Sequence, residues 1–167
     1  MQNKDMFSLE THDGDETSIS YRIAGDGPPL LLLHGFPQTN MMWHKIAPAL
    51  AERYTVVAAD LRGYGDSGHP ESDAAHAPYP KRAMAADMAG LMRGLGHDSF
   101  MVAGHDRGGR VAHRLARDHG DCVTRIAVLD IPHGGDVRAD RHAFCHSLLP
   151  LVLPDPAGAI ARTDDRC

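Results

Sequence analysis

The sequence predicts an α/β fold in which helices flank a mostly parallel sheet. Three short, mostly apolar runs are each followed by a segment with helical spacing, and this alternation is typical of βαβ units with right-handed crossovers. The apolar character of the runs indicates strands that are buried on both faces, as the strands of parallel sheets are. The three runs are Leu30–Leu33, Tyr54–Ala59 and Phe100–Gly104.

Shorter patterns predict the other elements. Residues Ser18–Ile23 alternate between apolar and polar side chains, which predicts an antiparallel strand at the edge of the sheet. Arg125–Leu129 predicts a further strand. Helices are expected over 41–53, 81–94 and 108–118, and turns or loops over 25–29, 60–68 and 69–80.

The composition excludes several classes of partner. The 167 residues are 43% hydrophobic and 23% charged, as expected of a soluble globular domain with a core. The net charge of −5 gives no reason to expect nucleic acid or an anionic membrane as a partner. No apolar run approaches the roughly 20 residues of a membrane-spanning helix, and the N-terminus lacks the apolar core of a signal peptide. A cytoplasmic location is therefore expected.

Neither a metal nor another cofactor is expected. The three cysteines, Cys122, Cys145 and Cys167, form no disulfide framework and no paired zinc-binding spacing. His142 and His146 are four residues apart, which would suit a metal on a helix, but no third ligand has suitable spacing.

The segment Gly104–Arg110, with the sequence Gly-His-Asp-Arg-Gly-Gly-Arg, predicts a sharp turn between a strand and a helix. Its glycines allow the chain to turn tightly enough to expose the Asp106 side chain above the sheet. A carboxylate at that apex can attack saturated carbon and form an ester. Asp106 could instead simply favour the turn, but the preceding strand and the doubled glycine favour a nucleophile.

Asp130 directly follows the predicted strand Arg125–Leu129. Open α/β sheets place their functional sites at the carboxyl ends of parallel strands. Asp130 is therefore a candidate for the acid that orients a catalytic histidine. The alternative is a helix N-cap or an ordinary loop aspartate.

Arg107 and Arg110 are three residues apart at the start of the predicted helix, so both can face the same side. Two neighbouring cations are unfavourable unless an anion joins them, which predicts a substrate carboxylate. Each charge-assisted hydrogen bond to it would contribute roughly 1.5–3 kcal/mol. Alternatively, Arg110 packs along the helix and pairs with a nearby acid.

The segment His34-Gly35-Phe36-Pro37 ends the first apolar strand. The backbone N–H of Phe36, together with that of Arg107, could hold an oxyanion during ester hydrolysis. A simple turn from strand to loop is the alternative.

Together these motifs resemble the haloacetate (fluoroacetate) dehalogenases of the α/β-hydrolase superfamily. The resemblance runs from about Leu30 to Ile131. It depends on four motifs: His34–Gln38, Asp60–Ser67, Gly104–Arg110 and Val128–Ile131. The first two are shared with epoxide hydrolases. The third is more specific, because epoxide hydrolases usually carry Trp after the nucleophile and need no ligand for a carboxylate.

The resemblance implies hydrolytic dehalogenation of short 2-haloacids such as haloacetate through an aspartyl ester. It implies Asp106 as the nucleophile, Asp130 as the triad acid, and Arg107 and Arg110 as ligands of the substrate carboxylate. The expected partner is this small-molecule haloacid, and intact relatives could form homodimers. The alternatives are an epoxide hydrolase-like α/β-hydrolase and a non-catalytic remnant or binding module.

After Ile131 the resemblance stops. The family continues with a helical cap that holds the halide and ends with the triad histidine, and neither can be assigned here. We therefore expect residues 1–131 to form the N-terminal part of an α/β-hydrolase core, without the C-terminal strands and the cap. Residues 132–167 are expected to be an unrelated, poorly ordered tail, which leaves the chain truncated and inactive alone.

A frameshift would explain the tail. With permitted codons, reading 148–162 one base later gives a sequence that resembles the family's cap segment. Each shifted codon has its first and last bases largely fixed, so a long match is improbable by chance. The hypothesis is a frameshift between about Asp130 and His133.

Overall fold

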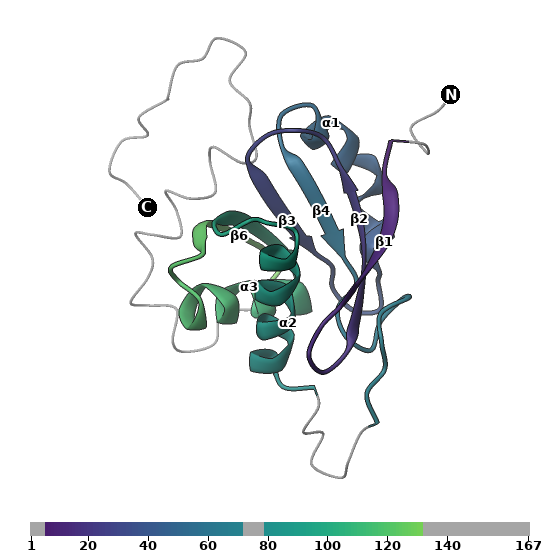
Figure 1. Ribbon diagram of the computed structural model, residues 1–167, viewed down its shortest axis with the longest axis vertical. Coiled ribbons are helices and arrows are strands. Elements are labelled where there is room, and N and C mark those ends of the chain that lie inside the picture. Colours follow the sequence, from purple (N-terminus) through teal and green to yellow (C-terminus); the bar gives the residue numbers. More distant parts are fainter. Residues whose placement is uncertain (1–5, 72–78, 132–167) are drawn as a thin grey trace.

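The computed structural model describes residues 6–71 and 79–131. The described residues form one six-stranded sheet with the strand order β1-β2-β4-β3-β5-β6 (Figure 1). Strands β3 to β6 run parallel to one another, whereas β1 and β2 are antiparallel to their neighbours. The predicted α/β class with a mostly parallel sheet is thereby confirmed. The strands are β1 Ser8–Asp13, β2 Ser18–Ala24, β3 Pro29–Leu33, β4 Thr55–Ala59, β5 Phe100–His105 and β6 Val123–Leu129.

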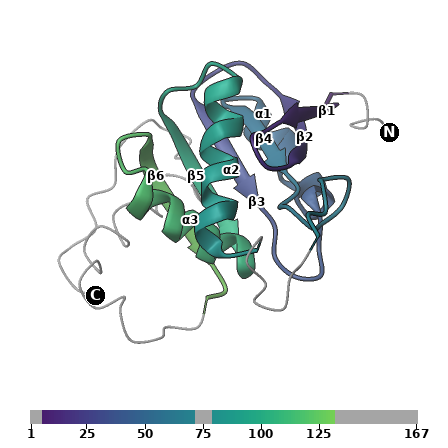
Figure 2. The same cartoon turned by 60° about the horizontal axis from the view of Figure 1, so that its bottom comes forward.

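Helices cover both faces of the sheet. Figure 2 shows α2 and α3 side by side on one face, with α1 on the other. A 3-10 helix, η1, precedes α1. Within the described ranges, no helix has the length and apolarity needed to cross a membrane. The helices are η1 Asn40–Lys45, α1 Ala47–Ala51, α2 Lys81–Gly94 and α3 Arg107–Asp118.

The leucines of β3 explain why its sequence is continuously apolar. Leu31 and Leu33 pack in the core beneath α2 and α3, whereas Leu30 and Leu32 pack in the core beneath α1. All four side chains are at most 1% exposed. Successive strand residues point to opposite faces, so a strand covered on both faces needs apolar residues at every position.

Two predictions about the elements were wrong. The segment 18–23 is an antiparallel strand as expected, but it is not at the edge, because β1 pairs outside it. Nearly all of β1 is exposed, so it lacks the apolar alternation by which a half-buried strand is recognised. The predicted helix 41–53 is divided into η1 and α1. Pro48 lies in the first turn of α1, where its missing N–H is tolerated and where it starts a new helix.

The other elements agree with the predictions to within two residues at each end. The expectations for the tail lie outside the described residues, including the frameshift and the pair His142 and His146. They stay predictions.

Candidate active site

Asp106 occupies the turn between β5 and α3, with φ 47° and ψ −110°. A positive φ is unfavourable for a residue with a Cβ, by about 1–3 kcal/mol. Backbone hydrogen bonds hold the turn: the Asp106 N–H donates to the Leu129 carbonyl at 2.9 Å, and the Arg110 N–H donates to the Asp106 carbonyl at 3.2 Å. The apex therefore has the strained backbone of a strand-to-helix elbow.

Glycines let the neighbouring backbone approach this elbow. A Cβ on Gly35 would lie 2.8 Å from both Cβ of Asp106 and Nδ1 of His105. A Cβ on Gly108 would collide with the carbonyl oxygens of Leu33 and His34. No side chain larger than hydrogen fits at either position without displacing backbone or the Asp106 side chain.

The Asp106 carboxylate is held by backbone donors. Its Oδ2 accepts the Phe36 N–H at 3.0 Å. That hydrogen bond is the main cause that lowers the pKa of Asp106, and the Arg107 N–H and the Arg110 charge lower it further. Asp106 is consequently ionised at neutral pH, as a nucleophile must be. The Phe36 and Arg107 N–H groups are the two that the sequence predicted as donors to an oxyanion, and here they contact the Asp106 carboxylate.

The two arginines of the elbow are exposed cations. The Arg107 guanidinium carbon lies 5.0 Å from the centre of the Phe36 ring, which is a cation–π distance. Within the described residues, neither Arg107 nor Arg110 forms an ion pair with a carboxylate. Arg110 therefore does not pair with a nearby acid there, and both guanidinium groups can accept an anion.

Asp130 lies at the carboxyl end of β6, one position beyond the paired residues His105 and Leu129. It also has a positive φ of 53°, and its side chain is 83% exposed. Its Oδ2 is 3.6 Å from Nε2 of His105. The fold therefore puts Asp106 and Asp130 after neighbouring strands, but the contact of Asp130 is with His105.

His105 is a neighbour of Asp106 for which the sequence predicted no role. Its Nδ1 is buried and has no hydrogen-bond partner in the described part of the chain. The ring lies against Gly35, at the base of the loop that carries Phe36. The signal for His105 in the sequence was its position next to Asp106 in the Gly104–Arg110 motif.

His34 fastens the loop that presents Phe36. Its Nε2 accepts the Leu61 N–H at 3.0 Å, which leaves Nδ1 to donate to the Gly35 carbonyl at 2.8 Å. Burial lowers the pKa of His34, so the ring is neutral. This histidine has a structural role, because both of its nitrogens are occupied by backbone groups.

The Asp60–Ser67 motif is also a structural support. The Asp60 carboxylate accepts backbone N–H groups from both Asn40 and Asp66. The buried Arg62 guanidinium donates two hydrogen bonds of 2.6 Å to Asp87. These contacts fix the loop after β4 beside the elbow.

A hollow of about 330 Å³ lies next to the elbow. It includes Phe36 and Arg107 from the predicted site and adds Lys81, which sequence analysis missed. Its lining residues are Phe36, Arg62, Gly63, Tyr64, Tyr79, Lys81, Met84 and Arg107.

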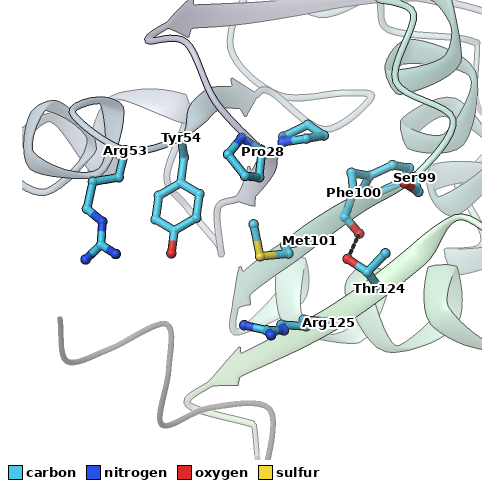
Figure 3. A pocket seen from close by; sticks show the side chains of 9 residues that line it. Pro28, Arg53, Tyr54, Ser99, Phe100, Met101, Thr124 and Arg125 are labelled. Atoms are coloured by element: carbon cyan, nitrogen blue, oxygen red, sulfur yellow. Dashed lines mark hydrogen bonds between the residues drawn. The ribbon is translucent and has the colours of Figure 1, made fainter. Parts of the chain in front are cut away.

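A second hollow of about 490 Å³ lies at the other end of the strands, where β3 to β6 begin (Figure 3). It is lined by residues at the amino ends of β3 to β6, including Phe100, the first residue of β5, and Thr124. The Thr124 hydroxyl donates to the Phe100 carbonyl at 3.1 Å. Among the described residues that line this hollow there is no carboxylate or histidine, so we do not take it as the candidate active site. Among the described residues, no group of three His, Cys, Asp or Glu side chains could hold a metal ion.

Comparison with known proteins identifies the family. The chain is 56% identical over 125 residues to a fluoroacetate dehalogenase from Burkholderia sp, and 47% identical over 116 residues to a soluble epoxide hydrolase from Corynebacterium sp. (strain C12). These matches cover 75% and 70% of the chain, but only 41% and 39% of the relatives. The chain thus spans about two fifths of their length.

A crystal structure from Nostoc sp PCC 7120, described as an alpha/beta hydrolase, superposes with a TM-score of 0.74 and 57% identity. That alignment covers 75% of this chain and 43% of the Nostoc chain. The model of the alpha/beta hydrolase fold family matches residues 28–147, which include the elbow and its supporting loops. The chain belongs to the alpha/beta hydrolase fold family.

Proposed function

We propose that this chain carries the nucleophile and the carboxylate ligands of a dehalogenase that acts on short 2-haloacids such as haloacetate. The observation that supports this most is the ionised Asp106 on a strained elbow, next to Arg107 and Arg110, which have no carboxylate partner in the described residues. The similarity to a fluoroacetate dehalogenase over 75% of the chain also supports this proposal.

In the first step, an Asp106 carboxylate oxygen attacks the carbon that bears the halogen. A carbon–oxygen bond forms, the carbon–halogen bond breaks, and the halide leaves with its electron pair. Arg107 and Arg110 hold the substrate carboxylate, which fixes the carbon in front of Asp106. The product of this step is an ester between Asp106 and the acid.

In the second step, water attacks the ester carbonyl of Asp106 and gives a proton to a base. The bond between the carbonyl carbon and the substrate oxygen then breaks, the 2-hydroxy acid leaves with that oxygen and takes up the proton, and the Asp106 carboxylate is restored. The oxyanion that forms would be held by the N–H groups of Phe36 and Arg107, which already contact the carboxylate. Water must first be activated by a histidine that Asp130 orients. Among the described residues, the histidine in contact with Asp130 is His105. It is the last residue of β5 and the backbone neighbour of Asp106, so we do not assign it the activation of this water. We therefore propose that this chain alone stops at the ester.

The second candidate is an epoxide hydrolase, which the similarity to the Corynebacterium protein favours. An epoxide needs the same aspartate but has no carboxylate, so the free guanidinium groups of Arg107 and Arg110 would have no ligand. The third candidate is a non-catalytic remnant, in which Asp106 would not react.

Mass spectrometry of the chain after incubation with chloroacetate tests the proposal. We expect one carboxymethyl group per chain on the peptide that contains Asp106, and none there in Asp106→Asn. Peptide mapping separates this product from alkylated cysteine. An epoxide such as styrene oxide in place of chloroacetate tests the second candidate. Reaction of Asp106 with the epoxide but not with chloroacetate would support that candidate, and reaction with neither would support a remnant.

A further inference from the structure

Lys81 lines the same hollow as Phe36 and Arg107, and the steps above do not use it. It is the first residue of α2 and is half-buried. Its Nζ lies 3.6 Å from the Sδ of Met84. Among the described residues, no carboxylate forms an ion pair with this ammonium group.

The helix itself gives no reason for a cation at this position. The N-terminus of a helix carries a partial positive charge, so a lysine there is unfavourable. The first turn of α2 contains no acidic residue that would compensate. The next residue, Arg82, is different: it is exposed and lies 3.5 Å from the Asp118 carboxylate on α3.

The charges around Asp106 do not balance. Burial lowers the pKa of Lys81, and the charges of Arg107 and Arg110 lower it further, whereas Asp106 raises it. Of these three groups, Arg107 lines the same hollow as Lys81. The charges that act on Lys81 are those of two further cations and one carboxylate, Asp106, whereas Asp130 at the same end of the sheet contacts His105. This group of three cations and Asp106 therefore carries an excess of positive charge. Such an excess in a hollow attracts anions.

We propose that Lys81 is a specificity-determining residue whose ammonium group draws a carboxylate-bearing substrate into the hollow beside Asp106. The substrate class rests on the proposed function, because the haloacid is the anion that would react there. Lys81 selects for a negative charge and so disfavours neutral alkylating compounds. Because anion binding precedes the reaction, it can be measured separately from ester formation.

Three variants isolate the charge of Lys81. Lys81→Met removes the charge and keeps an unbranched apolar stem, and Lys81→Arg keeps the charge. Arg82→Met is the matched control, since it removes an adjacent cation that does not line the hollow. Thermal unfolding of each variant confirms that it folds.

The first measurement is binding of glycolate, the product of haloacetate hydrolysis, by NMR titration at low ionic strength. Lys81→Met should weaken binding by roughly three- to tenfold, and added salt should reduce this difference. Lys81→Arg and Arg82→Met should bind as the unaltered chain does. Equal affinity of Lys81→Met and the unaltered chain would overturn the proposal, as would the absence of glycolate binding to the unaltered chain.

The second measurement is the rate of alkylation of Asp106 by chloroacetate and by neutral chloroacetamide. Lys81→Met should slow the reaction with chloroacetate only. Equal slowing with both reagents would show that Lys81 supports the fold of the elbow and would overturn the proposal. If Asp106 in the unaltered chain does not react, while glycolate binding still depends on Lys81, the proposed function fails and the anion site remains.

Discussion

A hydrogen bond of 3.0 Å joins the Phe36 N–H to Oδ2 of Asp106, between residues that are 70 positions apart in the sequence. It connects the loop after β3 to the elbow after β5, which are neighbouring strands. It is also the main cause of the lowered pKa of Asp106. The geometry of one loop therefore contributes to the lowered pKa of the candidate nucleophile.

Gly35→Ala should raise the pKa of Asp106. The new Cβ would lie 2.8 Å from Cβ of Asp106, so the side chain must move away from the Phe36 N–H. The pH dependence of alkylation by chloroacetate measures this effect, and its acid limb should move to higher pH. Gly90→Ala is the matched control, because nothing lies within 4 Å of its new Cβ. An acid limb that stays unchanged in Gly35→Ala would contradict the assigned role of the Phe36 hydrogen bond.

Arg107→Ala and Arg110→Ala should each slow the alkylation of Asp106 by chloroacetate. Loss of one charge-assisted bond, at ~1.5–3 kcal/mol, corresponds to a reduction of roughly ten- to hundredfold. Chloroacetamide lacks the carboxylate, so it should react slowly and be insensitive to both changes. If the rates of alkylation by both reagents fall by the same factor, the arginines support the fold, and the structure no longer favours a haloacid over an epoxide as substrate.

Arg62→Met should strongly destabilise the chain. The guanidinium is buried and donates two hydrogen bonds of 2.6 Å to Asp87. Its removal therefore leaves a mostly buried carboxylate without its cation. Loss of one partner of such a pair lowers the free energy of unfolding by about 3–5 kcal/mol. Urea denaturation measures this change. Arg114→Met, which removes an exposed contact with Asp118, should have a much smaller effect. Equal effects would mean that the contact between Arg62 and Asp87 does not support the loop.

The contribution of His34 to stability should depend on pH. Burial lowers its pKa below the ordinary value of 6.5, so the unfolded chain binds a proton at this site more readily than the folded chain. The stabilisation is complete above about pH 6.5 and decreases as the pH falls through the lowered pKa.

Urea denaturation at about pH 7.5 and about pH 5 tests this dependence. The difference in free energy of unfolding between the unaltered chain and His34→Gln should be larger at the higher pH. A difference that is the same at both values would show that the His34 ring is not held neutral by the fold.

Much of the fold could be predicted because the pattern of each element is local. The helix 81–94 agrees with the prediction at both ends, since its apolar spacing is complete within the segment. Strand β1 could not be predicted in this way. It is exposed along most of its length, and only its pairing with β2 makes it a strand.

The candidate site was only partly predictable. The Gly104–Arg110 motif contains both the candidate nucleophile and the two neighbouring arginines, so this part of the site could be proposed from a single segment. Lys81 is 25 positions before Asp106, and only the packing of α2 against α3 brings it to the hollow. The contact between His105 and Asp130 depends on the register of β5 and β6, which the sequence does not specify.

We propose that Asp106 is a nucleophile and that this chain does not hydrolyse the ester that Asp106 forms. The most direct measurement is the amount of chloride released per chain from excess chloroacetate, with Asp106→Asn as the control. We expect the unaltered chain to release one equivalent more than Asp106→Asn, after which both chains release only the chloride that comes from alkylation of cysteine. Release of many equivalents would mean that a histidine of this chain completes the cycle, and equal release from both chains would mean that Asp106 is not the nucleophile.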